Sequence, residues 1–142
     1  MEREKTTFVF LIEYTPEKTM ETLHVAMVQP DMVWEDPGSN LTILDEMLKE
    51  MDEETDLIVL PETFSTGFTM NASQFSEGEG GTARKWMEEL ARERQVHVTG
   101  SLIFREGERI FNRLFWISPD GIEGHYDKRH LFRMAEEHHH YR

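Results

Sequence analysis

The order of the hydrophobic patterns is the feature that most limits the fold of this chain. Five segments have the apolar alternation or the short apolar runs of β-strands: residues 23–29, 57–60, 96–104, 110–117 and 122–126. Helical patterns separate the first three strands, whereas only short turns separate the last three. The run at 57–60 has no polar alternation, which is typical of a parallel strand covered on both faces. This order predicts an α/β fold with a mixed β-sheet.

Both predicted helices have recognisable start signals. Asp36 is the expected N-cap of the first helix, and Pro37 follows at the first helical position, where a missing N–H is tolerated. The apolar stripe of this helix recurs every three or four residues, at Leu41, Leu44, Leu48 and Met51. Thr82 is the expected N-cap of the second helix, which has apolar residues at Ala83, Trp86, Met87, Leu90 and Ala91.

The net charge of −13 restricts the partners that the chain can have. Nucleic acids and anionic membrane surfaces need a basic face, so neither is expected to bind. Part of the negative charge is concentrated in residues 45–56, which hold seven carboxylates and one lysine. This pattern is typical of a solvated helix face. No apolar stretch is long enough to cross a bilayer or to act as a secretory signal, and a cytoplasmic protein is expected.

The first residues do not continue into these patterns. Met20 is the expected natural start, with residues 1–19 as an upstream extension, and an extra strand over residues 7–14 is the alternative. We therefore divide the chain into an unmatched N-terminal extension, residues 1–21, and a domain that begins at residue 22 and runs to residue 142.

Two charged residues directly follow predicted strands. Glu62 opens a loop of about twenty residues, 61–81, and ligands of open α/β sheets bind beyond the carboxyl ends of strands. A carboxylate there is placed to act as a base, although a capping or surface glutamate has the same pattern. Lys128 follows the last strand and could hold an oxyanion or a substrate carboxylate, although a lysine in this position is most often simply solvated.

The tail holds three consecutive histidines. If this segment were extended, His138 and His140 would share a face, as a two-histidine metal chelate requires. No further ligand is evident nearby, so a solvated polar tail or an appended tag is the favoured interpretation. We expect neither a metal site nor an organic cofactor.

Four segments occur in the order found in a known family. They are VAMVQP at 25–30, DLIVLPETFSTGF at 56–68, the pair Asn112-Arg113 and YDKRHLFRMA at 126–135. Together they resemble the nitrilase superfamily of carbon–nitrogen hydrolases, and the bacterial omega-amidases are the branch that they resemble most. The resemblance covers roughly residues 22–142 and implies the N-terminal half of a four-layer α-β-β-α sandwich.

The resemblance also implies a Glu–Lys–Cys triad that hydrolyses an amide. By position in the motifs, Glu62 matches the general base and Lys128 matches the lysine that stabilises the oxyanion. Glu137 is the best match to a supporting carboxylate, although the local match is loose, and the histidines then belong to a family segment. The implied substrates are 2-oxo dicarboxylic acid monoamides such as 2-oxoglutaramate, which are split at the terminal amide to the acid and ammonia.

The implied nucleophile is missing, because the chain contains no cysteine. Neither serine nor threonine follows Lys128 to replace it. We therefore expect an inactive fragment of an amidase, which would act on a small-molecule amide only when completed. The alternative is a non-catalytic pseudoenzyme fragment that acts by binding a partner. Either a homo-oligomer or a complementary half is the expected protein partner, because an incomplete sandwich exposes an apolar sheet face and strand edges.

Overall fold

A computed structural model of the protein describes residues 22–142, so the alternative strand over residues 7–14 lies outside the described part. The strands are β1 (Val25–Met27), β2 (Leu57–Val59), β3 (His97–Glu106), β4 (Arg109–Ser118) and β5 (Gly121–Asp127). The helices are α1 (Pro37–Leu48), α2 (Ala72–Phe75) and α3 (Thr82–Arg94), followed by the 3-10 turns η1 (Arg133–Ala135) and η2 (Glu137–His139). No helix within residues 22–142 is both long enough and apolar enough to cross a membrane.

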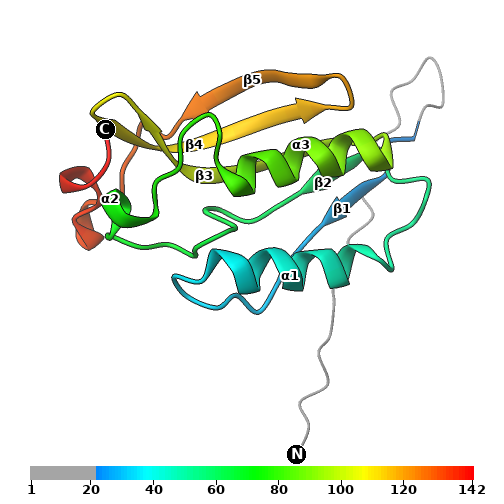
Figure 1. The fold of residues 1–142 in the computed structure, drawn as a ribbon, viewed down its shortest axis with the longest axis horizontal. Helices are drawn as coiled ribbons and strands as arrows, with labels where there is room; N and C mark the ends of the chain where they lie inside the picture. Colours follow the sequence, from blue (N-terminus) through cyan, green and yellow to red (C-terminus); the bar gives the residue numbers. More distant parts are fainter. Residues whose placement is uncertain (1–21) are drawn as a thin grey trace, which may run out of the picture.

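The five strands form one sheet in the order β1-β2-β3-β4-β5 (Figure 1). β1, β2 and β3 are parallel neighbours, and β3, β4 and β5 are antiparallel neighbours. Helical crossovers join the parallel strands, and tight turns join the antiparallel ones, as these two kinds of pairing require. The α/β class and the mixed sheet predicted from the sequence are confirmed.

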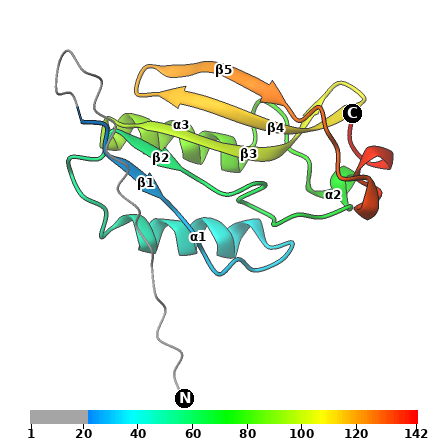
Figure 2. The same ribbon diagram turned by 180° about the vertical axis from the view of Figure 1, so that it is seen from behind.

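Both long helices pack on one face of the sheet, with α3 along β3 and β4 and α1 beside β1 (Figures 1 and 2). The predicted alternation in β3 is confirmed, because Val98, Leu102 and Phe104 all enter the core between sheet and helices. Gly100 lies in the same row, where a Cβ atom would come within 2.7 Å of the Leu60 Cβ. The helices contribute Leu44, Leu48, Met87 and Ala91 to this core.

The opposite face of the sheet has no such cover. The prediction that β2 is covered on both faces is only half right: Ile58 is fully buried against the helices, whereas Leu57 and Val59 are half-buried. Further along this face, Leu114, Trp116 and Tyr126 are 37–49% exposed. We call the row formed by Leu57, Val59, Leu114, Trp116 and Tyr126 the open face. The predicted exposure of an apolar sheet face is confirmed.

The two helix starts differ in how they are capped. The Asp36 carboxylate accepts a hydrogen bond from the Ser39 backbone N–H at 3.0 Å, as predicted from the Asp-Pro pair. The prediction of Thr82 as N-cap of α3 is wrong, because the cap position falls on Gly81. The Glu77 carboxylate takes over the capping role, accepting from the N–H groups of Ala83 (3.1 Å) and Arg84 (2.7 Å). A negative charge is favourable there because the helix dipole is positive at its N-terminus.

Gly81 leaves the space that this distant cap occupies. A Cβ atom at Gly81 would lie 2.4 Å from the Glu77 Cδ, whereas a Cβ atom at Gly80 would meet nothing within 4 Å. We expect Gly81→Ala to displace Glu77 and to lower the free energy of unfolding by about 1–2 kcal/mol, the usual cost of a lost cap. Gly80→Ala is the matched control and should be nearly neutral. Equal urea midpoints for the two variants would contradict this account.

Candidate active site

Glu62 stands at the carboxyl end of β2 in a tightly held turn. The backbone enters this turn with Leu60 N–H donating to the Thr99 carbonyl at 2.8 Å. The next residue, Thr63, is fully buried and has a left-handed φ of 45°, a conformation that costs a β-branched residue about 1–3 kcal/mol. Its N–H donates to the Ser101 Oγ at 2.8 Å, which ties the turn to β3. The buried, hydrogen-bonded Thr63 therefore fixes the position of the adjacent Glu62.

Lys128 is brought to Glu62 by the antiparallel pairing of β4 with β5. Its backbone N–H donates to the carbonyl of Asn112 on β4 at 2.9 Å, just beyond the end of β5. The Nζ atom then lies 2.8 Å from the Glu62 Oε1. The ring of Phe68, in the loop after Glu62, lies 5.2 Å from the same Nζ. The two predicted residues, which are far apart in the sequence, thus form an ion pair at one end of the sheet.

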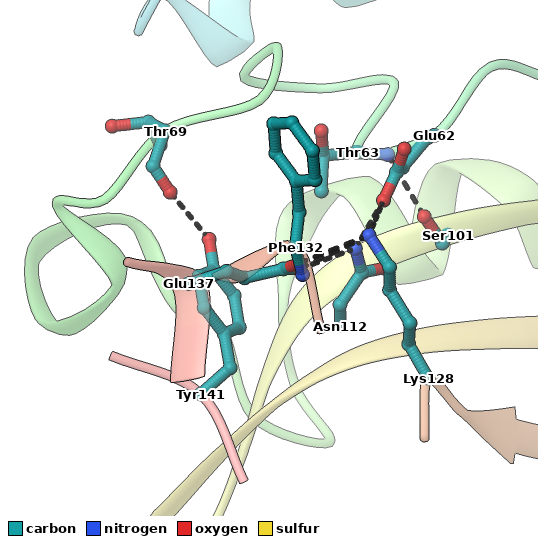
Figure 3. Close-up of polar contacts among 9 residues, drawn as sticks. All are labelled: Glu62, Thr63, Thr69, Ser101, Asn112, Lys128, Phe132, Glu137 and Tyr141. Carbon is teal, nitrogen blue, oxygen red and sulfur yellow. Dashed lines mark hydrogen bonds and ion pairs between the residues drawn. The ribbon is translucent and has the colours of Figure 1, made fainter. Parts of the chain in front are cut away.

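Glu137 enters the same cluster from the tail (Figure 3). Its side chain is fully buried, and its Oε2 lies 3.1 Å from the Lys128 Nζ. The same oxygen accepts a hydrogen bond from the Phe132 backbone N–H, which links the start of η1 to η2. The structure therefore brings together all three site residues named from the sequence, including the one whose local match is loose.

Asn112 also belongs to this cluster. The sequence analysis included it in a motif but predicted no role for it. Its Nδ2 donates to the Glu62 Oε1 at 2.6 Å and lies 3.5 Å from the Glu137 Oε1. A signal for it exists in the sequence, because Asn112 interrupts a row of apolar residues on one face of β4, between Ile110 and Leu114. A polar residue in such a row needs a buried partner.

The cluster places one ammonium group between two carboxylates. Burial disfavours the charged form of Lys128, but hydrogen bonds and the negative charges of Glu62 and Glu137 outweigh this effect and raise the pKa of Lys128 above its usual value. Lys128 therefore remains an ammonium ion at neutral pH. The Glu62 side chain is 50% exposed, Lys128 29% and Glu137 0%, so Glu62 is the carboxylate that a ligand can reach.

A pocket of about 250 Å³ lies beside the ion pair on the open face of the sheet. Its lining includes the two charged residues and an apolar wall formed by Val59, Leu114 and Tyr126. A group bound there can give a proton to Glu62 and place a developing negative charge near Lys128. The arrangement suits proton transfer coupled to oxyanion stabilisation.

The histidines of the tail do not form the extended segment that a chelate requires. His138 and His139 lie in η2, with ring centroids 4.0 Å apart. Among residues 22–142, no three His, Cys, Asp or Glu side chains come together as a metal site.

Tyr141 fastens the tail to the loop that follows Glu62. Its hydroxyl donates to the Thr69 carbonyl at 2.6 Å, and the side chain is 2% exposed. Burial, together with the negative charges of Glu137 and Glu62, raises the pKa of Tyr141 well above its usual value of about 10.

This pKa shift predicts a loss of stability in alkali. Between about pH 10 and the raised pKa of Tyr141, the unfolded chain releases the phenolic proton and the folded chain does not, so unfolding becomes more favourable as pH rises. We expect the urea midpoint to fall more steeply between pH 9 and 11 in the wild type than in Tyr141→Phe. Tyr126→Phe, at an exposed tyrosine, is the control and should keep the wild-type slope. Parallel pH profiles for all three proteins would contradict the prediction.

A family profile and several curated proteins match this chain. The family profile of carbon-nitrogen hydrolases matches residues 24–142. The chain is 41% identical over 122 residues to the omega-amidase YafV of Yersinia enterocolitica. This alignment covers 86% of this chain and 47% of that protein. It is 27% identical over 117 residues to the 2-oxoglutaramate amidase of Bacillus subtilis, covering 80% and 45%. The chain thus spans about half the length of the curated relatives that it matches.

A solved structure has the same fold. The crystal structure of a CN-hydrolase superfamily protein from Xanthomonas campestris, with an arsenic adduct in its active site, gives a TM-score of 0.78 at 37% identity. The alignment covers 83% of this chain and 44% of that one. The match to the family profile includes all five strands, both long helices and the Glu62–Lys128–Glu137 cluster. The chain belongs to the carbon-nitrogen hydrolase family, and its mixed sheet is part of the nitrilase-like fold.

Proposed function

We propose that this chain supplies the general base and the oxyanion-stabilising lysine of an amide hydrolase of the omega-amidase type. Glu62 is the base, Lys128 holds the oxyanion, and Glu137 supports the lysine. The observation that carries the proposal is the position of the Lys128 ammonium group, between an exposed and a buried carboxylate and beside a pocket. The family membership and the omega-amidase relatives support the same chemistry.

The reaction needs a thiol that these 142 residues do not contain. A fold relative, the Nesterenkonia amidase, is described with an active-site cysteine. In the completed site, Glu62 takes the proton of such a thiol, and the thiolate attacks the amide carbon. Lys128 stabilises the negative charge on the carbonyl oxygen. Ammonia leaves with the proton from Glu62, and water then hydrolyses the thioester with the same carboxylate as base.

The two glutamates divide the work according to their burial. Glu137 has no exposed surface, and its Oε2 accepts from the Phe132 N–H and contacts Lys128, so it keeps the ammonium group charged and oriented. Glu62 is half exposed and faces the pocket, where a proton can be exchanged with a bound thiol and substrate. An ammonium ion so held is available to an oxyanion without being neutralised.

The proposed substrates are 2-oxo dicarboxylic acid monoamides of the 2-oxoglutaramate type, cleaved at the terminal amide. The names of two similar proteins, an omega-amidase and a 2-oxoglutaramate amidase, support this class. The substrate is a small molecule, and the pocket beside Glu62 holds about 250 Å³.

Completion with a cysteine-bearing segment tests the proposal. We expect the purified 142-residue protein to release no ammonia from 2-oxoglutaramate, because it has no cysteine. Fusing residues 22–142 to the remaining part of the Yersinia enterocolitica omega-amidase, in place of the segment they match, should supply the expected cysteine and restore turnover. We call this fusion the completed protein. The same fusion with its cysteine replaced by alanine is the control. Steady turnover by the 142-residue protein, or a folded completed protein without turnover, would contradict the proposal.

The second candidate function is that of a non-catalytic chain that binds a protein partner. The apolar open face and the lack of a cysteine favour it. This reading predicts self-association of the 142-residue protein, whereas a sharp monomeric boundary in sedimentation velocity would count against it. It also predicts a completed protein that folds and binds but does not turn over.

A further inference from the structure

We propose that Asn112 is the positioning residue of this site, which fixes the Glu62 carboxylate so that one oxygen is engaged and the other faces the pocket. The inference rests on the proposed role of Glu62 as a base. It adds a fourth residue, on a different strand, whose side chain takes no part in proton transfer.

Asn112 contacts every charged member of the cluster. It lies on β4 opposite Ile103 of β3, and its side chain is 3% exposed. Its Nδ2 donates to the Glu62 Oε1 at 2.6 Å and lies 3.5 Å from the Glu137 Oε1. Its carbonyl accepts from the Lys128 N–H at 2.9 Å. Asn112 thus holds the position of both the Lys128 backbone and the Glu62 side chain.

The chemistry of the partners fixes the orientation of the Asn112 amide. Ionised carboxylates only accept hydrogen bonds, so the NH₂ end of the amide, and not its oxygen, must point at Glu62 and Glu137. The amide and the Lys128 ammonium converge on the same oxygen, Oε1 of Glu62, at 2.6 and 2.8 Å. Within residues 22–142 the second oxygen has no hydrogen-bond partner, and in Figure 3 it points away from Lys128 and Asn112. That oxygen is the one available to take a proton.

A neutral amide suits this position better than a charged or an apolar side chain. An aspartate would place a third negative charge beside a single ammonium group. A leucine would leave the half-exposed Glu62 side chain held by Lys128 alone, and free to occupy other rotamers. Because small misplacements of a reacting group can lower rates by about 10²-fold, we expect Asn112→Leu to lower kcat by about that factor. KM should change less than kcat, because Asn112 lines the pocket but its side-chain amide is directed at the two glutamates.

The hydrogen bond itself can be observed in the 142-residue protein, without any activity. In a ¹⁵N-labelled sample, the Asn112 side-chain amide should give one strongly shifted proton that is protected from solvent exchange. Glu62→Ala should return this signal toward the position of a free amide. The buried Asn40 amide donates to the Val33 and Ser65 carbonyls instead, so its signals should stay unchanged.

Kinetics of the completed protein supply the second test. Asn71→Leu is a matched control, because it removes an Asn–Glu hydrogen bond of the same length, 2.6 Å to Glu35, outside the site. We expect Asn71→Leu to keep kcat and both Asn112→Leu and Asn112→Asp to lower it. Full kcat in Asn112→Leu, or an Asn112 amide signal that ignores Glu62→Ala, would overturn this inference alone. Full kcat in Glu62→Gln would overturn the proposed function and this inference with it.

Discussion

Replacing Glu62 by glutamine in the completed protein should lower kcat for ammonia release by about 10³-fold, within the range expected when a general base is lost. Glutamine keeps the size of the side chain and can still accept hydrogen bonds from Lys128 and Asn112, but it cannot take the thiol proton. The loss should therefore appear in kcat and not in the melting temperature. Coupled detection of ammonia under saturating 2-oxoglutaramate measures it directly.

The control for this variant is Glu123→Gln. Glu123 is a half-exposed carboxylate on β5 that faces His97 at 3.8 Å and does not touch the Glu62–Lys128 pair. Its replacement removes the same charge from a carboxylate outside the site and should leave kcat unchanged. If both variants lose activity equally, the effect comes from net charge or folding and the assignment of Glu62 as base fails.

Replacing Lys128 by methionine should lower the free energy of unfolding of the 142-residue protein by about 3 kcal/mol at pH 7. The cause is Glu137, whose side chain has 0% exposed surface and would lose its counter-ion. The Phe132 N–H and the Asn112 amide remain as its neighbours and limit the penalty. Urea unfolding at neutral pH measures the difference.

A surface lysine serves as the control. Lys49 pairs with Glu46 at 2.6 Å, but both side chains are more than 60% exposed, and such pairs contribute about 0–1 kcal/mol. Lys49→Met should therefore be nearly neutral. Similar urea midpoints for Lys128→Met and Lys49→Met would show that Glu137 is not a buried charge in need of its lysine.

Local patterns in the sequence predicted the elements that depend on local physics. The alternation in β3, the apolar run of β2 and the Asp36-Pro37 helix start all follow from side-chain periodicity and backbone chemistry within a few residues. The prediction failed at Thr82 because the cap of α3 comes from Glu77. The Glu77 backbone forms a β-bridge with Phe104 of β3, and this contact places the Glu77 side chain near the start of α3. Local sequence does not encode such a contact.

The site was predictable only in part for the same reason. Glu62 directly follows β2, so the rule for strand ends marked it as a candidate, whereas the roles of Glu62 and Lys128 came from the family resemblance. Glu137 lies in a 3-10 turn without periodicity, and only the resemblance to a family pointed to it. Asn112 acts through contacts with two carboxylates, one in the turn after β2 and one in η2, which only the tertiary fold brings to β4. The pattern marked it as unusual but could not supply its partners.

The open face also gives the protein an intrinsic optical reporter. The three tryptophans of the protein lie in different surroundings. The Trp86 indole N–H donates a hydrogen bond to Asp45 between the two long helices, and Trp34 is 64% exposed in a loop. Trp116 is 37% exposed in the middle of the open face. Indole emission shifts to shorter wavelength when water leaves its surroundings. Any polypeptide that covers the open face therefore shifts the emission of Trp116 and leaves that of Trp86 unchanged. The fluorescence spectrum of the unlabelled protein thus reports whether the open face is exposed to water.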